Sequence, residues 1–359
     1  MFRYIRKRIL YGLLVMLGVV VLVFFLFNIL PGDPARMMLG QRADEESVMI
    51  INKDLGRDKP LYQQFFNYLN DLSPISFHNS NNPESYWYLD STKYSPYCTL
   101  VAIGETSAVL KYPYLRRSYQ SKRPVADILT EAFPKTALLA IVAMTFALAV
   151  GITIGIFSAL YKDSIFDKLA FFVSVIGMSL PSFFAAILIA WLFAYVLADY
   201  TGLNMFGNLF TVDDYGTGEY LDLKNLILPA LTLGIRPLAV IIELTKNSML
   251  EVLSQDYIRT AKAKGLKKTK IIWHHALQNA LNPIVTSASG WLAGLMAGAV
   301  FVEYVFDWKG MGIVIVDGLE KYDFPVVMGA ILFICVILVV INILVDILYG
   351  ILDPRVRLD

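Results

Sequence analysis

The sequence predicts an all-α membrane protein with six transmembrane helices, and three observations support this fold class. Charged residues make up only 17% of the 359 residues, whereas soluble domains average about 25%. The mean hydropathy is +0.57. Six apolar runs are long enough to cross a hydrocarbon core of about 30 Å, which needs about 20 helical residues, and they lack the two-residue alternation of barrel strands. These runs cover approximately residues 9–30, 134–160, 168–198, 226–247, 284–304 and 326–350.

The chain begins with a basic segment, Arg3 to Arg8, which precedes the first apolar run. A secretory signal peptide is the alternative, but the run from Ile9 to Leu30 exceeds the roughly 7–15 residues of such a signal, and no small-x-small cleavage site follows. We therefore expect a retained helix with its N-terminus in the cytoplasm, as the positive-inside rule requires. Six crossings then place residues 161–167, 248–283 and the tail 351–359 in the cytoplasm, and residues 31–133, 199–225 and 305–325 outside.

Residues 31–133 form the one loop large enough for an extramembrane domain, and residues 134–350 form the predicted transmembrane core. One or two amphipathic helices are expected between Ala43 and Leu72. The segment 73–116 is rich in Asn, Ser, Pro and Tyr, which favours short strands. We interpret it as an insertion that covers the outer face without chemistry of its own. The alternative is a substrate or partner contact through Tyr86, Trp87, Tyr88 and Tyr94.

Signatures of catalysis and metal binding are missing from the sequence. It has no GxxxxGK[ST] phosphate loop, HExxH or GxSxG motif. His274 and His275 are adjacent, so on a helix they point about 100° apart and cannot chelate one metal from one face. Cys98 lies in a polar region and Cys335 in an apolar run, which argues against a disulfide between them. We expect no metal site and no enzymatic activity on this chain.

Ionisable groups in or near apolar runs are candidates for function or for contacts between helices. Glu243 and Lys246 have the spacing of a local pair. Asp346 is expected to make a polar contact between helices near the cytoplasmic side. Arg236 either lines a pathway through the membrane or pairs with an acid such as Glu303, so both are weak pathway candidates.

Small residues and a proline predict how two of the runs pack. Gly290, Gly294 and Gly298 recur every four residues and form a smooth helix face, for which we favour close helix–helix packing. The alternative is that this face borders a pathway. Pro181, in the third run, predicts a tilt or a kink.

The loop 248–283 is strongly basic and has the pattern of a helix, a glycine and a second helix. The first helix is predicted from Met249 to Lys264, and Gly265 ends it as a C-terminal glycine does. Thr269 to Leu281 resumes the helical pattern. Such a segment can lie on anionic lipid or insert into a groove of a cytosolic protein, and its charge alone does not separate these possibilities.

The segment DYIRTAKAKGLKKTKIIWHHALQNALNP resembles the cytoplasmic coupling motif of ABC transporter permeases, in the version found in the dipeptide/oligopeptide/nickel permease family. The likeness extends along most of the chain. The chain departs from the family pattern between Asp71 and Arg117, where roughly forty residues replace a short connection. Further segments that resemble the family are ILPGDP, LGRDKPLYQQFFNYL, RSYQSKRPVADIL, SLPSFF, ILPALTLG, SMLEVLSQDY, VEYVFDWKGMG and NILVDILYGILDPRVR.

The resemblance implies a multi-pass permease in the cell membrane, which works as a subunit of an ATP-driven importer for di- or oligopeptides. Its implied partners are a second permease, two cytosolic ATPases that bind ATP and magnesium, and an extracytoplasmic binding protein. The chain itself would hold no cofactor. A permease for nickel or another small solute is the alternative within the family, and a membrane-embedded enzyme or a scaffold is the alternative outside it. By position, the residues implied to contact an ATPase are Asp256, Arg259, Thr260, Ala261, Lys264, Gly265 and Leu266.

Overall fold

The computed structural model describes residues 2–29, 36, 44–54, 59–82, 85, 87–94, 96–212 and 218–352. Two compact units make up the chain. The helical unit comprises Met1–Val15, Glu131–Ile313 and Ile334–Asp359, and the sheet unit comprises Met16–Thr130 and Val314–Phe333. Residues 353–359 of the predicted tail lie outside the described residues, as do residues 31–34 and Tyr86.

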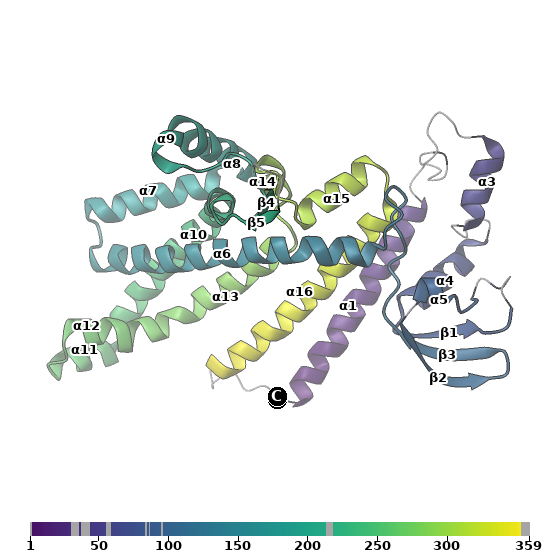
Figure 1. Ribbon diagram of the computed structural model, residues 1–359. Helices are drawn as coiled ribbons and strands as arrows, with labels where there is room; N and C mark the ends of the chain where they lie inside the picture. Colours follow the sequence, from purple (N-terminus) through teal and green to yellow (C-terminus); the bar gives the residue numbers. More distant parts are fainter. Residues whose placement is uncertain are drawn as a thin grey trace. The chain divides into compact units, whose positions relative to one another are not determined.

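Helices dominate both units (Figure 1). Four long helices carry the apolar runs: α1 (Phe2–Ile29), α6 (Val125–Leu160), α10 (Lys224–Leu253) and α16 (Phe324–Leu352). The remaining helical elements of the helical unit and its border are α7 (Ile165–Ser179), α8 (Ser182–Trp191), the π-helical η2 (Leu192–Val196), α9 (Ala198–Thr201), α11 (Asp256–Ala263), α12 (Lys268–Lys270), the π-helical η3 (Ile271–Ala276), α13 (Leu277–Met296), α14 (Val300–Val305) and α15 (Met311–Glu320).

The predicted runs are interrupted at two places. In the third run, α7 ends at Ser179 and α8 begins at Ser182, and the two helices meet at an angle of 114°. The kink expected at Pro181 is therefore a complete break, because proline cannot donate to the preceding turn. In the fifth run, α13 ends at Met296 and α14 begins at Val300, with Gly298 between them at φ +110°.

By length and composition, the described part of the chain holds four helices that could cross a membrane, or five if the bent pair counts as one span. These are α1, α6, α10, α16 and the pair α7–η2. The chain is thus a mostly helical protein with several candidate spans.

Helix α10 lies at the centre of the helical unit, where glycines allow its neighbours to approach closely. Gly151 and Gly155 of α6 face it: a Cβ on Gly155 would lie 2.5 Å from the Cβ of Thr245 and 2.8 Å from the carbonyl oxygen of Ile242. Helix α7 also packs on α10 through Gly177. The GITIG sequence of α6 is a small-xxx-small motif of the kind that packs membrane helices, and our sequence interpretation missed it.

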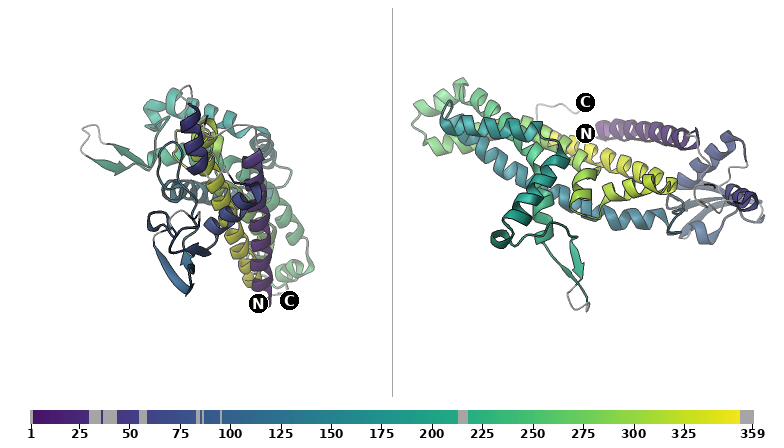
Figure 2. Two further views of the ribbon diagram at one scale, coloured as in Figure 1. Left: turned by 90° about the vertical axis from the view of Figure 1, so that its right-hand side faces the viewer. Right: turned by 90° about the horizontal axis from the view of Figure 1, so that it is seen from above.

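The sheet unit shows that the chain is not entirely α-helical. It contains α3 (Glu45–Asp54), α4 (Leu61–Leu72) and α5 (Ser91–Tyr94), and an antiparallel sheet of order β1-β3-β2 formed by β1 (Ile75–Asn79), β2 (Tyr97–Ile103) and β3 (Thr106–Lys111). The amphipathic helices and short strands predicted for this loop are confirmed. A second hairpin, β4 (Phe210–Val212) with β5 (Glu219–Leu221), was not predicted; Figure 2 shows it extending from the helices of the helical unit.

The two ends of the sheet-bearing insertion meet at Asp71, a buried residue in the last turn of α4. The hydroxyl of Tyr94 donates to the Asp71 carboxylate (2.8 Å), and the ammonium of Lys111 donates to the Asp71 backbone carbonyl (2.6 Å). The backbone N–H of Tyr114 reaches the same carbonyl. Burial raises the pKa of Asp71 and lowers the pKa of Lys111 to about 8. These contacts join the two ends of the insertion.

Candidate functional site

The basic loop forms a sharp turn around Gly265. The backbone N–H of Leu266 donates to the carbonyl of Ala261 (3.3 Å) and that of Gly265 donates to the carbonyl of Lys262 (3.0 Å). With φ of +76° at Gly265, this is the Schellman arrangement that ends a helix. The predicted C-terminal glycine is confirmed. The predicted start at Met249 is wrong, because α10 continues to Leu253 and α11 begins separately at Asp256.

Helix α11 has one buried face and one exposed face. Ile258 and Ala261 are buried in a cluster with Met249 of α10 and Ala276 of η3. Ala261 therefore supports the helix from within the chain, and Leu266 packs on the same cluster. Tyr257 is exposed. The exposed face carries the remaining implied coupling residues, Asp256, Arg259, Thr260, Lys264 and Gly265.

The exposed face of α11 is polar and internally ordered. The Arg259 guanidinium lies 3.3 Å from the Asp256 carboxylate, and the Thr260 hydroxyl donates to the Asp256 carbonyl (3.0 Å). A Cβ on Gly265 would meet no described atom within 4 Å. Because both ion-pair partners are largely exposed, their attraction contributes little to stability. The face is thus available to a partner that supplies its own contacts.

The second half of the loop joins directly to the fifth run. α12, η3 and α13 follow one another without a break from Lys268 to Met296, and Pro283 lies inside α13. Movement of the Gly265 turn would therefore be transmitted along a continuous helical segment. The π-helical turn holds His274 and His275, whose side chains are exposed and partly exposed. Among the described residues, no group of three or more His, Cys, Asp or Glu side chains could hold a metal ion.

A buried ion pair ties the α6–α7 connection to α10. The Lys246 ammonium lies 2.6 Å from the Asp167 carboxylate, which also accepts from the Ser158 hydroxyl (2.6 Å) and the Asp163 backbone N–H (3.0 Å). The predicted pair between Lys246 and Glu243 is therefore wrong: a residue distant in sequence offers Lys246 a better-ordered partner. Within the described part of the chain, Oε1 of Glu243 is buried and has no hydrogen-bond partner.

A second ion pair joins the first and last helices of the helical unit. The Arg8 guanidinium lies 3.0 Å from the Asp346 carboxylate. The predicted contact of Asp346 with another helix is confirmed, and Arg8 of the basic N-terminus is its partner.

Glu303 is fully buried and organises the chain that follows α14. Its carboxylate accepts from the Thr136 hydroxyl of α6 (2.8 Å) and from the backbone N–H groups of Gly312 (2.7 Å) and Ile313 (3.3 Å). The two backbone donors lie in the first turn of α15, so Glu303 satisfies a helix N-terminus from outside the helix. The predicted pair with Arg236 is wrong, and whether Glu303 or Arg236 lines a pathway stays a prediction.

Arg236 lies at a cavity of about 340 Å³ formed by α7, α8, α10, α13 and α14. The lining also includes Thr232, Trp291, Gly294 and Phe301. The close packing favoured for this glycine face is not seen within the described part of the chain at two of its three positions: a Cβ on Gly290 or Gly294 would meet no described atom within 4 Å. The third, Gly298, is confined, because a Cβ there would lie 3.1 Å from the backbone nitrogen of Gly312.

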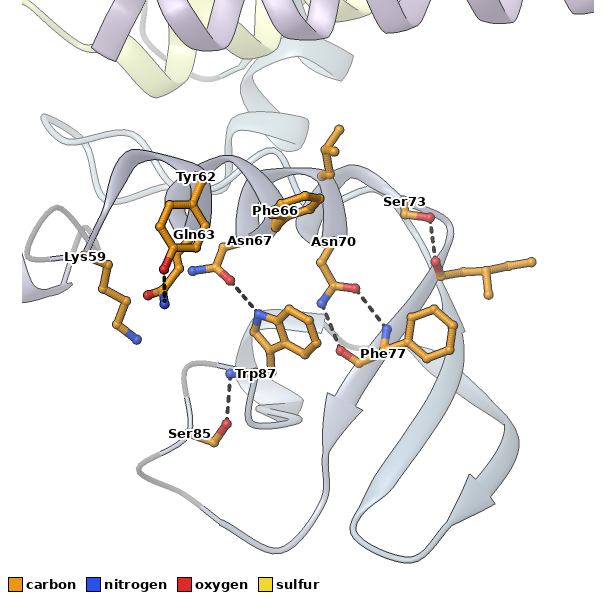
Figure 3. Close-up of a pocket in the computed structure, with 12 residues that line it drawn as sticks. Lys59, Tyr62, Gln63, Phe66, Asn67, Asn70, Ser73, Phe77, Ser85 and Trp87 are labelled. Carbon is orange, nitrogen blue, oxygen red and sulfur yellow. Dashed lines mark hydrogen bonds between the residues drawn. The ribbon is translucent and has the colours of Figure 1, made fainter. Parts of the chain in front are cut away.

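A larger cavity, of about 680 Å³, opens in the sheet unit between α4 and β1 (Figure 3). Exposed aromatic rings surround it, among them Trp87, whose indole donates to the Asn67 side chain. The Asn70 amide exchanges two hydrogen bonds of 2.9 Å with the backbone of Phe77 and so covers the free edge of β1. Of the aromatic residues proposed for contacts, Tyr94 is buried and Trp87 is exposed; the contact itself stays a prediction.

Comparisons with known proteins cover nearly the whole chain. Residues 151–358 match the family described as "Binding-protein-dependent transport system inner membrane component", and residues 1–80 match the N-terminal part of such components. The chain is 34% identical to the di/tripeptide transport system permease protein DppB of Pseudomonas aeruginosa and 34% identical to the glutathione transport system permease protein GsiC of Escherichia coli K12, covering 99% of each. An inward-facing structure of the MetNI methionine ABC transporter has a similar fold, with a TM-score of 0.50 and 14% identity over 63% of this chain and 96% of that chain.

Proposed function

The chain belongs to the family of binding-protein-dependent transport system inner membrane components, and we propose that it is one permease subunit of an ATP-driven peptide importer. It is a multi-pass inner-membrane protein. Relatives that transport dipeptides, tripeptides and glutathione are similar over nearly their whole length. Small peptides with ordinary termini are therefore the proposed cargo.

The observation that carries the coupling part of this proposal is the Gly265 turn. It presents Asp256, Arg259, Thr260 and Lys264 on an exposed face, while Ile258 and Ala261 anchor α11 to residues of α6, α10 and η3. An anchored and exposed short helix is suited to a groove on another protein. We assign that groove to a cytosolic ATPase, which supplies ATP hydrolysis and holds ATP and magnesium. This chain needs neither.

The proposed assembly contains two permease chains, two ATPases and an extracytoplasmic binding protein. We propose six crossings with both termini in the cytoplasm. Four are α1, α6, α10 and α16; the bent pair α7–η2 and the broken pair α13–α14 supply the other two. The loop 31–133, with its sheet, then lies outside, where a binding protein would arrive. Closure of the ATPases would move α11 and rock the helices between inward-open and outward-open arrangements.

A charge reversal on the exposed face tests the coupling assignment. Arg259→Glu should weaken co-purification of the ATPases by about tenfold or more, because a like charge replaces a cation at a charge-complementary contact. Lys268→Glu is the matched control: it also replaces a cation by Glu on the same basic loop, beyond the turn. Equal ATPase recovery with both variants would contradict the assignment of α11 to the docking groove.

A further inference from the structure

The Arg236 cavity has an unusual distribution of charge. Arg236 is the one charged residue among those that line it; the others are apolar, small or aromatic, apart from the hydroxyls of Ser182 and Thr232. Thr232 precedes Arg236 by four residues on α10, so both face the cavity from successive turns. A guanidinium cannot lose its proton under physiological conditions. The cavity therefore presents a permanent cation within the helical unit.

Glu303, the acidic residue nearest in sequence to the residues that line the cavity, does not neutralise Arg236. Val302 and Phe301 line the cavity, but the carboxylate of Glu303 is directed to Thr136 and the N-terminus of α15. Among the described residues, no ion pair involves Arg236. Arg236 is exposed and lines the cavity. An uncompensated cation among apolar walls attracts an anion more strongly than one in bulk water, because the local dielectric is lower.

The part of the cavity lined by α13 leaves room for a ligand. Gly294 lines the cavity, and a Cβ built on it would meet no described atom within 4 Å. Trp291, one turn earlier on α13, adds an aromatic surface against which an apolar side chain can pack. The cavity thus offers one fixed polar anchor and an adaptable apolar surround, the usual composition of a small-ligand site.

We propose that this cavity is a cargo-binding site in which Arg236 receives the C-terminal carboxylate of the transported peptide. The proposal deepens the proposed function and rests on it. The planar guanidinium can bind a carboxylate through two parallel hydrogen bonds. The apolar walls, which carry no further charge, accept side chains of varied shape. The permease then recognises a feature that all free peptides share and leaves side-chain discrimination to other parts of the transporter.

The test uses the complete transporter in lipid vesicles, with its ATPases and saturating binding protein, and compares uptake of trialanine with its C-terminal amide. The affinity of the binding protein for each peptide is measured separately and divided out. Wild type should favour the free acid. Arg236→Gln should lower uptake of the acid by about tenfold or more and bring the acid-to-amide ratio close to one. Lys309→Gln, which removes an exposed cation outside the cavity, should leave the ratio unchanged.

A second arm leaves Arg236 in place and so does not depend on how the Gln variant folds. Gly294→Glu puts a carboxylate into the open part of the cavity, where it should occupy Arg236 and reduce the preference for the acid. Gly294→Gln has nearly the same shape without charge and should keep the preference.

Three outcomes would overturn the carboxylate site. The first is an acid preference that survives Arg236→Gln. The second is an equal acid preference in Gly294→Glu and Gly294→Gln. The third is the loss of the assembled complex in both Gly294 variants, which would assign the open face to a second permease chain. Failure of the proposed function looks different: the wild-type complex would then take up neither peptide when ATP is supplied.

Discussion

At the scale of single residues, Glu303 explains an entire motif, VEYVFDWKGMG. Its carboxylate occupies space that glycines leave open: a Cβ on Gly312 would lie 2.8 Å from Oε2 of Glu303, and one on Gly310 would clash with the Thr136 hydroxyl. Thr136 in turn accepts from the backbone N–H of Met311 (2.8 Å). One buried acid, one hydroxyl and two glycines thus fix the start of α15 against α6. Such networks are costly when one member is removed.

Replacing Glu303 by Gln should therefore destabilise the protein. The amide keeps one acceptor oxygen, but its NH₂ group meets either the Thr136 hydroxyl or the two backbone donors of α15. We expect the free energy of unfolding to fall by about 1–3 kcal/mol, measured as a lower Tm of the purified protein in detergent. Glu320→Gln makes the same change at an exposed acid of α15 and should leave the Tm nearly unchanged. Similar Tm values for the two variants would contradict the network.

Gly265 allows a second prediction at this scale. Asp and Asn tolerate the left-handed conformation better than other non-glycine residues, so Gly265→Asp and Gly265→Asn should both fold and insert. Each nevertheless places a side chain at the tip that we assign to the ATPase groove. We expect Gly265→Asp to separate ATP hydrolysis from uptake, seen as a raised number of ATP molecules hydrolysed per peptide transported in vesicles. Gly265→Asn tests whether a side chain without a charge is sufficient to uncouple hydrolysis from uptake. Normal coupling in both variants would contradict the assignment of this turn to the ATPase groove.

At the scale of elements, the apolar runs and the terminal glycine of α11 were predictable because each is a local pattern. Composition and run length located the long helices, and Gly265 marked the end of α11. The partners of charged groups were not predictable, because Lys246 finds Asp167 and Glu303 finds Thr136 across 79 and 167 positions of sequence. The spacing along one helix favoured the nearer acid, Glu243, but in the structure Lys246 pairs with Asp167 instead.

Glycine spacing was misleading for a related reason. Both α6 and α13 carry glycines four residues apart, and the sequence alone does not say which face another helix covers. The structure separates them: Gly155 is pressed against Thr245 and Ile242, whereas Gly290 has no described atom near its Cβ position. The same motif packs helices in α6 and leaves an open surface on α13.

Alanine substitutions at these two glycines should therefore have opposite effects. Gly155→Ala overpacks the α6–α10 contact and should cost about 1–3 kcal/mol. Gly290→Ala gains helix propensity without a clash and should be neutral or stabilising by up to about 1 kcal/mol. Thermal unfolding of the two purified variants measures the difference. A destabilised Gly290→Ala protein would mean that another chain covers this face in the assembly.

At the scale of the whole molecule, the two units differ in how they are stabilised. The helical unit relies on apolar helix packing and a few buried polar ties, whereas the sheet unit has a polar centre around Asp71, Lys111 and Tyr94. His78 belongs to that centre: it is fully buried, its ring lies 4.6 Å from that of Tyr94, and one ring nitrogen contacts the Ser76 hydroxyl at 2.9 Å. Burial, with a smaller contribution from the Lys111 charge, lowers the pKa of His78 to about 4.

This shift predicts an acid-sensitive sheet unit. Between about pH 6.5 and pH 4 the unfolded chain binds a proton at His78 that the folded chain does not, so the free energy of unfolding decreases as the pH falls through this window. The loss could reach about 3 kcal/mol, partly offset by Asp71, whose raised pKa acts in the opposite direction. Hydrogen exchange in β1 and β3, corrected for intrinsic rates, should show the slope, and His78→Phe should flatten it. An unchanged slope in that variant would assign the acid sensitivity to another group.

The proposed membrane topology can be tested by labelling a cysteine of the native sequence. Cys98 is exposed on β2, while Cys335 is buried, so six crossings predict that a membrane-impermeant maleimide labels wild-type protein in intact cells at Cys98. In a Cys98→Ser background, Ser80→Cys should restore labelling from outside, because Ser80 is exposed in the same unit. Thr269→Cys, exposed just beyond the Gly265 turn, should react only after the membrane is permeabilised. Labelling of Thr269→Cys in intact cells would invert the proposed topology and separate the basic loop from any cytosolic ATPase.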